Sequence, residues 1–310
     1  MTNYNEHTPV LLEEVLSFVP KKKLTYVDMT LGRAGHASEI LSRVLKGSTF
    51  YGVDRDKDAL DYSRGFLSSY SSKVDLHFLH IDFAHAIDEI KRHEKGADFI
   101  LMDIGVSSPQ FDDPSRGFSY RYDAPLDMRM DRSDGITAKD IVNTYSEKEL
   151  YRVFHDLGEC RYAMNVVKKI EEARTIASID TTFQLVDIIK SALPEKELRK
   201  EGHPAKQFFL GLRYEVNDEI GELRTGVEKA IDFLNPKGRL AVISFNSEED
   251  KIVKDAFRKV DRPHHIDKYA KTKDADSYTN LTKKPIVPSV DEIRANPRAK
   301  ASILRVLERS

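Results

Sequence analysis

The stretch LTYVDMTLGRAGH, residues 24–36, joins a short apolar run to a turn that contains two glycines. The run LTYVDM (24–29) is typical of a buried strand, and from His36 to Leu45 the apolar residues recur at helical spacing. Glycines between a strand and a helix let the backbone turn tightly and approach a ligand at the carboxyl edge of an open α/β sheet. This stretch therefore predicts the first strand and helix of such a sheet.

The segments that follow repeat the same alternation. Strands are predicted at 49–54, 74–82 and 97–105, and helices at 58–67 and around Ile87 and Ile90. Strands separated by helices of about ten residues indicate a parallel sheet covered on both faces. The expected fold class is an α/β, doubly wound, Rossmann-like sheet.

The pattern changes between about Asp112 and Ala205, where helices and loops are indicated but no strand. Capping signals at Ser146 and Thr181 begin two of these helices. Alternation then returns, with a helix at 206–233, the strand RLAVISF (239–245), a helix at 248–259 and a strand-like KKPIVP (283–288). We therefore expect three parts: a first part of the sheet domain (1–111), an inserted helical domain (112–205), and a second part with a basic C-terminal tail (206–310).

Composition bounds the class of protein. The net charge is −2, and no apolar run approaches the roughly 18 residues of a membrane span. The N-terminus, MTNYNEHTPVLLEEV, lacks the pattern of a secretory signal, and the one cysteine excludes a cysteine-based metal cluster. We expect a cytoplasmic protein without a membrane partner. The charge near the C-terminus, including Arg298 and Lys300, suits phosphate binding or, alternatively, a solvated surface.

A second acidic signal follows the glycine turn. Asp54 ends the second predicted strand 22 residues after Gly32, where an acidic side chain can bond a ribose. The second glycine of a dinucleotide fingerprint would fall at Ala34, which disfavours NAD and FAD. Asp28 and Asp103 suit a cation, so S-adenosylmethionine is the favoured ligand. A tight strand-to-helix turn without a ligand explains the glycines but not the spacing of Asp54.

The stretch DIGVSSPQ, residues 103–110, follows the fourth predicted strand and offers polar groups to a substrate. Asp103 can accept a hydrogen bond from a substrate amine, and Ser107, Ser108 and Gln110 supply donors and acceptors. The alternative is a helix cap. The long irregular segment after it, which includes Arg116 and Arg129, is of a length that is usually functional.

Taken in order, these stretches resemble the bacterial ribosomal RNA small subunit methyltransferase H family. The resemblance covers nearly the whole chain and rests on HTPVLLEEV (7–15), DMTLGRAGH (28–36), DIGVSSPQFD (103–112), RGFSY (116–120), DAPLDMRMD (123–131), GECRYA (158–163), HPAKQFF (203–209), LRYEVNDE (212–219), GRLAVISFNSEED (238–250) and NPRAKASILRVLER (296–309). It implies a class I methyltransferase fold with an inserted helical substrate domain.

The resemblance also implies an activity: S-adenosylmethionine-dependent methylation of N4 of cytosine 1402 in the 16S ribosomal RNA of the small subunit, with no metal. The implied cofactor contacts are Ala34, Gly35, His36, Asp54, Phe83, Asp103 and Gln110. Asp103, Ser107 and Ser108 are the expected catalytic residues, and Arg116, Arg129, Arg298 and Lys300 the expected RNA contacts.

The sequence departs from the family at four positions, and it leaves two other functions open. Ala34 and Ala124 stand where the family usually has glycine, Cys160 where it has glutamate, and Asn246 where it has histidine. Two alternatives are a methyltransferase of DNA or a small molecule, and a non-catalytic assembly factor that keeps the fold.

Overall fold

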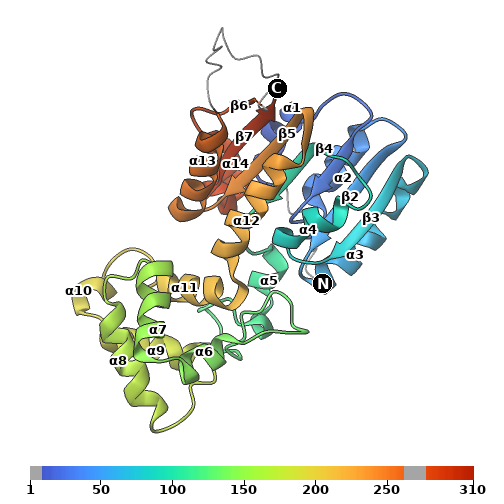
Figure 1. The fold of residues 1–310 in the computed structure, drawn as a ribbon. Coiled ribbons are helices and arrows are strands. Elements are labelled where there is room, and N and C mark those ends of the chain that lie inside the picture. Colours follow the sequence, from blue (N-terminus) through green and yellow to red (C-terminus); the bar gives the residue numbers. More distant parts are fainter. Residues whose placement is uncertain (1–8, 262–276) are drawn as a thin grey trace. The chain divides into compact units, whose positions relative to one another are not determined.

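In the part of the chain that the structure describes, seven strands form one sheet in the order β3-β2-β1-β4-β5-β7-β6 (Figure 1). Their bounds are β1 Thr25–Asp28, β2 Ser48–Asp54, β3 Val74–His80, β4 Ala97–Asp103, β5 Leu234–Ser244, β6 Tyr278–Asn280 and β7 Ile303–Arg309. The computed structural model describes residues 9–261 and 277–310. The first five strands pair in parallel, as the alternation of strands and helices predicts.

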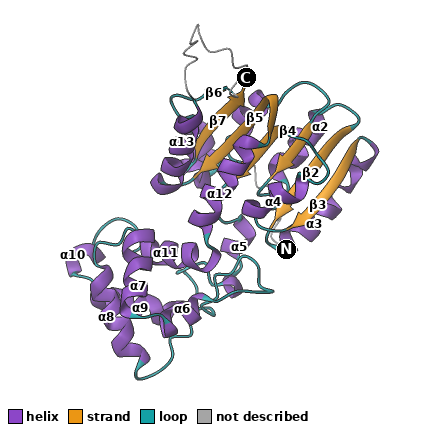
Figure 2. Cartoon of the chain, in the orientation of Figure 1, coloured by secondary structure: helices purple, strands orange, loops and turns teal. Residues whose placement is uncertain are grey.

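Helices lie on both faces of this sheet (Figure 2). One face is covered by α1 (Leu12–Phe18), α2 (Gly35–Arg43) and α3 (Lys57–Leu67). These helices share a core with strand residues that alternate along the pleat, such as Tyr26, Phe50 and Phe99. The remaining helices of this unit are α4 (Phe83–Ile90), α12 (Glu219–Asp232), α13 (Ser247–Val260) and α14 (Val290–Ala295).

The C-terminal residues are not a surface tail, which corrects the expectation from the sequence. β7 lies inside the sheet and pairs antiparallel with both β5 and β6. The predicted strand at 283–288 is reduced to a single bridge between Ile286 and Leu304. Arg305 is buried in β7 because its guanidinium donates two hydrogen bonds to Asp250 on α13, at 2.6 and 2.8 Å.

The chain divides into two units, of which the sheet and its helices (Met1–Gly105 and Gly221–Ser310) are the first and Val106–Ile220 the second. The interval 112–205 proposed from the sequence lies inside the second unit. Its longer helices are α6 (Ala138–Thr144), α7 (Glu147–Arg152), α8 (Ala163–Arg174), α9 (Thr182–Ala192) and α11 (Lys206–Asn217). Among its residues, extended pairing is limited to a bridge between Pro125 and Thr181.

Two helices predicted from the sequence are not single regular α-helices in the structure. The helix expected at 206–233 is α11 followed by α12, because Asp218 between them has a left-handed φ of 46°. The helix that begins at Ser146 continues past α7 as one π-helical turn, Val153–Leu157. Short helices complete the second unit: α5 (Ser108–Asp112) and α10 (Glu195–Leu198). No helix within the described residues is long and apolar enough to cross a membrane.

Candidate functional site

Three neighbouring strands each end in an aspartate. Asp28 is the last residue of β1, Asp54 of β2 and Asp103 of β4. Because β1 pairs in parallel with both β2 and β4, the three residues share the carboxyl edge of the sheet. This edge is where open α/β folds bind their ligands. A cluster of acids there favours a ligand that carries positive charge.

Asp54 fastens the glycine turn to the sheet. Its Oδ2 accepts a hydrogen bond from the Gly32 N–H at 2.7 Å, and its Oδ1 accepts one from the Asp56 N–H at 2.8 Å. The sequence suggested contact with a ribose, and each carboxylate oxygen can accept more than one hydrogen bond. Asp54 therefore shapes the turn, and its contact with a ligand stays a prediction.

The turn itself requires small residues. Ala34 is fully buried with a left-handed φ of 60°, a conformation that costs a residue with a Cβ about 1–2 kcal/mol. A Cβ on the next residue, Gly35, would lie 2.8 Å from Cγ of Pro9. Ala34 thus adopts, with some strain, a backbone conformation that glycine adopts without strain.

All three aspartates have raised pKa values. Burial raises the pKa of Asp28 to about 7, against hydrogen bonds from the Tyr26 hydroxyl and the Thr30 N–H that lower it. Burial raises the pKa of Asp54 to about 6. Burial, the Asp28 charge and the Glu249 charge together raise the pKa of Asp103 to about 8. Negative charge is costly at this edge chiefly because burial removes these carboxylates from water.

His36 contributes an acceptor to Asp103, not a cation. Its Nε2 lies 2.9 Å from the Val10 carbonyl oxygen, which can only accept, so Nε2 carries the proton. The other nitrogen, Nδ1, is then an unprotonated acceptor 3.6 Å from Oδ2 of Asp103. Burial lowers the pKa of His36 to about 4, which keeps the ring neutral. A neutral ring with its lone pair toward Asp103 favours the protonated form of that carboxyl.

The second oxygen of Asp103 has no partner. Oδ1 is buried, and among the described residues no donor reaches it. The Asp103 side chain as a whole is 27% exposed. The Asp103 backbone N–H donates to Oγ1 of Thr30 at 2.6 Å, which ties the end of β4 to the turn after β1. A buried acceptor without a donor is unfavourable unless a ligand supplies one.

Glu249 on α13 belongs to the same cluster of charges, and sequence reasoning did not select it. It is buried, and its Oε2 accepts a hydrogen bond from the Phe245 N–H at 2.8 Å. Asn246 caps α13 by accepting bonds from the N–H groups of Glu248 and Glu249 at 3.1 and 3.0 Å. Asparagine is a favoured N-cap residue, so its presence in place of histidine has a structural basis. The signal for Glu249 was its position in the first turn of α13, the helix that follows β5.

Phe83 begins α4 just after the carboxyl end of β3. Its ring packs against α12, where a Cβ on Gly226 would lie 2.7 Å from Cδ2 of the ring. Gly226 therefore makes room for the ring. Phe83 lies at the carboxyl edge, as the resemblance implies, and its contact with the cofactor stays a prediction.

Ser107, Ser108 and Gln110 belong to the second unit, at the start of α5. Ser107 and Gln110 form a capping box in which the Ser107 N–H donates to Oε1 of Gln110 at 2.9 Å. The helix-cap interpretation of SSPQ therefore holds locally, and Gln110 is buried. Roles in catalysis or cofactor binding remain predictions.

The two arginines proposed from the irregular segment hold that segment together. Arg116 is buried, and its guanidinium donates to the carbonyl oxygens of Arg129 and Met130 at 3.1 and 2.8 Å. Arg129 makes a two-pronged pair with Asp127, at 2.8 and 3.0 Å. These contacts favour a structural role for Arg116 over contact with a phosphate. Arg298 and Lys300 are exposed, in the 3₁₀ turn Pro297–Ala301 of the first unit.

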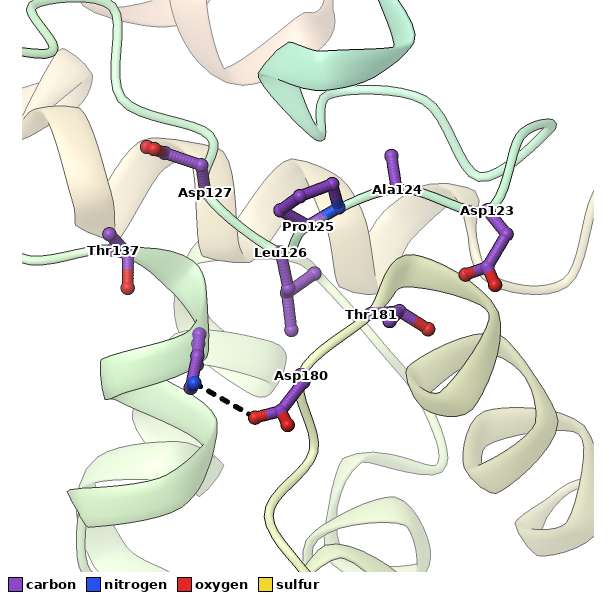
Figure 3. Close-up of a pocket in the computed structure, with 9 residues that line it drawn as sticks. Asp123, Ala124, Pro125, Leu126, Asp127, Thr137, Asp180 and Thr181 are labelled. Carbon is purple, nitrogen blue, oxygen red and sulfur yellow. Dashed lines mark ion pairs between the residues drawn. The ribbon is translucent and has the colours of Figure 1, made fainter.

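A shallow cavity of about 490 Å³ lies within the second unit. Figure 3 shows its lining, which comes from the segment Asp123–Asp127 and from Thr137, Lys139, Asp180 and Thr181. Lys139 bridges it by an ion pair with Asp180 at 2.9 Å, and the Leu126 N–H donates to the Asp180 carbonyl at 3.0 Å. The Asp180 carboxylate is therefore already paired within the lining of the cavity. Within the described residues no group of three His, Cys, Asp or Glu side chains is arranged to hold a metal ion.

Known proteins resemble this chain over nearly its whole length. It is 42% identical over 310 residues to ribosomal RNA small subunit methyltransferase H of Lactiplantibacillus plantarum, with 98% of this chain and 97% of that protein covered. It is 40% identical over 321 residues to the protein of the same name from Streptococcus dysgalactiae subsp. equisimilis, with 100% and 99% covered.

Among solved structures, a SAM-dependent O-methyltransferase from Thermotoga maritima is a distant match. It is 7% identical, with a TM-score of 0.42 and with 99% of this chain and 68% of that chain covered. The family model described as the MraW methylase family matches residues 4–310. With that match and two relatives at 40–42% identity, the chain belongs to the MraW methylase family and is a methyltransferase.

Proposed function

We propose that this methyltransferase uses S-adenosylmethionine to methylate N4 of cytosine 1402 in 16S ribosomal RNA, with the small ribosomal subunit as substrate. The names of both relatives, ribosomal RNA small subunit methyltransferase H, support a ribosomal RNA of the small subunit as the substrate. The observation that supports the chemistry is Asp103, at the carboxyl edge of the sheet, whose buried Oδ1 has no hydrogen-bond donor among the described residues. We place the activity in the cytoplasm, where small subunits are made.

The residues at this edge fit the proposed cofactor. S-adenosylmethionine carries a positive sulfonium and a positive ammonium group, and when bound it supplies the methyl group. Asp28, Asp54 and Asp103 all have raised pKa values because of burial, so a cation would favour their ionised forms. The proposed contacts are Ala34, Gly35, His36, Asp54, Phe83, Asp103 and Gln110.

Asp103 is the proposed acceptor for the substrate amine. The N4 amine of cytosine is a poor nucleophile because its lone pair is delocalised into the ring. An ionised Asp103 can accept a hydrogen bond from the amine, favour a pyramidal nitrogen and take up the proton that the nitrogen loses. Alignment of the amine supplies a further several kcal/mol. Ser107 and Ser108 are proposed to position the base, which must be unstacked to enter a pocket.

The test offers methyl-labelled S-adenosylmethionine to four substrates: free 16S RNA, small subunits, whole ribosomes and duplex DNA. We expect label in small-subunit RNA, recovered as N4-methylcytosine after digestion. Label in DNA alone would exclude a ribosomal substrate. Cofactor binding without transfer to any substrate would indicate a non-catalytic assembly factor.

The matched variant is Asp103→Asn, which keeps the shape of the side chain and removes its charge. We expect turnover to fall on the order of a hundredfold, the usual contribution of a positioned acid or base. Cofactor affinity, measured on the same protein by calorimetry, separates this loss from a loss of binding.

A further inference from the structure

An exposed aromatic and basic surface lies next to the glycine turn. α3 buries Ala59, Leu60, Ser63 and Leu67 against the sheet. Its outer face carries Tyr62 and Phe66, whose side chains remain 39% and 51% exposed. Their rings stack 6.0 Å apart with an interplanar angle of 17°. Exposing two large stacked rings to water is unfavourable, and the exposed parts of these rings add nothing to the core of this unit.

One arginine extends this surface. Arg33 is exposed, and its guanidinium lies 4.2 Å above the Tyr62 ring. Arg64 lies on the other flank of α3, with its guanidinium 5.5 Å from the Phe78 ring of β3, so it is not part of this surface. We call Arg33, Tyr62 and Phe66 the α3 platform.

The α3 platform is joined to the cofactor turn by hydrogen bonds. Oγ of Ser63, on the buried face of α3, donates to the Gly32 carbonyl at 2.7 Å. The Gly32 N–H in turn donates to Asp54 at 2.7 Å. Arg33 follows Gly32 directly. A ligand on the platform therefore lies beside the turn that is proposed to hold the cofactor.

The chemistry of the platform matches single-stranded RNA. Unpaired bases stack on aromatic rings and on guanidinium planes, and the Arg33 charge attracts the phosphates between them. The acidic residues of α3 have partners of their own. Asp61 bonds to Lys57 and also interacts with Arg64, and the helix dipole offsets the charge of Asp58 in the first turn. A protein partner or a second copy of the chain would have to supply an acid to match the Arg33 charge.

We propose that the α3 platform binds an unpaired segment of the RNA substrate and stacks its bases on Tyr62 and Phe66. This inference rests on the proposed function, since it assigns a further contact for the same substrate. The platform adds to the affinity for RNA and leaves the affinity for the cofactor unchanged.

The first experiment places a reporter on the platform. Because the chain has no tryptophan, Tyr62→Trp creates a single tryptophan there. Leu45→Trp is the matched control, since Leu45 is 55% exposed and lies between α2 and the start of β2, at the amino end of that strand, whereas the glycine turn lies at the carboxyl edge. With a short single-stranded oligoribonucleotide of mixed sequence, we expect saturable quenching of Tyr62→Trp and none of Leu45→Trp.

The second experiment removes the platform. We expect Tyr62→Ala with Phe66→Ala to weaken binding of the same oligoribonucleotide about tenfold, and Arg33→Ala to weaken it less and to reduce its salt dependence. Leu45→Ala with Lys46→Ala, which also removes an exposed apolar side chain and a cation, should bind as the unaltered protein does. For small subunits, the platform double variant should raise KM and leave kcat unchanged.

Three outcomes would overturn the proposal: an unquenched Tyr62→Trp in a formed complex, unaltered RNA affinity in the double variant, or a dimer in sedimentation that the double variant abolishes. The last would assign the platform to a second copy of the chain. If no RNA accepts a methyl group while quenching persists, the proposed function fails and the platform stands. If transfer and KM are normal in the double variant, the platform alone fails.

Discussion

Cys160 is the one cysteine of the chain, so any thiol nucleophile of this protein would have to be this residue. It is buried in the second unit, where its thiol lies 3.5 Å from the Gly158 carbonyl oxygen. Burial, with the Glu159 charge, raises the pKa of the thiol to about 12. A thiol with so high a pKa carries almost no thiolate at neutral pH, and the thiolate is the nucleophilic form.

This bears on which atom of cytosine receives the methyl group. Methylation at ring carbon C5 generally requires a thiolate to attack C6, whereas transfer to N4 requires none. We therefore expect Cys160→Ser to retain transfer within a few-fold and to yield N4-methylcytosine. Nucleoside analysis of the digested RNA checks both points. Loss of turnover in a folded variant, together with C5-methylcytosine from the unaltered enzyme, would contradict the N4 reaction.

Single residues also show where sequence reasoning reached its limit. Asp54 could be selected because its distance from Gly32 is a local property of the chain. Its two bonds to the backbone were not predictable, since they depend on how the turn folds back on β2. Arg116 is among the RNA contacts expected from the sequence, yet its guanidinium donates to the carbonyl oxygens of Arg129 and Met130.

At the scale of elements, the parallel strands were predictable and β7 was not. β1, β2 and β4 are largely apolar and mostly buried, and they lie between helices, so composition alone indicates burial. β7, ILRVLER, carries charges that resemble those of a solvated surface. Those charges are matched from elsewhere: Arg305 by Asp250, and Glu308 by Arg239 of β5 at 2.8 Å. Partners so far apart in sequence leave no local signal.

The basic residues that remain on the C-terminal elements are the ones to test for RNA binding. Arg305 pairs with Asp250 of α13, and the guanidinium of Arg309 donates to the Leu234 carbonyl oxygen of β5. Arg298 and Lys300 lie exposed in the 3₁₀ turn before β7. We expect Arg298→Ala with Lys300→Ala to lower RNA affinity and to flatten its salt dependence, by a slope of roughly 2 for two phosphate contacts.

Titration of RNA binding against salt, with cofactor affinity as the control, measures this slope. The matched variant is Arg294→Ala with Lys237→Ala, since both of these cations already pair with acids, Asp291 and Glu308. An unaltered slope in the Arg298 and Lys300 variant would return these residues to the solvated surface.

At the scale of the whole molecule, the acids at the carboxyl edge link folding, ligand binding and pH. The pKa values of Asp28, Asp54 and Asp103 are raised from 3.8 to about 7, 6 and 8, respectively. Between pH 3.8 and the raised pKa of each carboxyl, the folded protein binds more protons than the unfolded chain. The free energy of unfolding therefore falls as pH rises through this window. His36 acts oppositely, because its pKa is lowered from 6.5 to about 4, so its effect is complete above pH 6.5.

The window from pH 6.5 to 8 thus isolates the carboxyls, and a cationic ligand should reverse their effect. We expect the affinity for S-adenosylmethionine to rise about tenfold across this window, because binding to the ionised form requires release of the Asp103 proton. Calorimetry in buffers of different ionisation enthalpy measures the protons released. S-adenosylhomocysteine, which lacks the sulfonium charge, should show a smaller rise. Asp103→Asn should remove most of the rise between pH 7 and 8, since Asp103 has the highest pKa of the three. A pH-independent affinity, or proton uptake on binding, would mean that the cofactor does not meet these carboxyls.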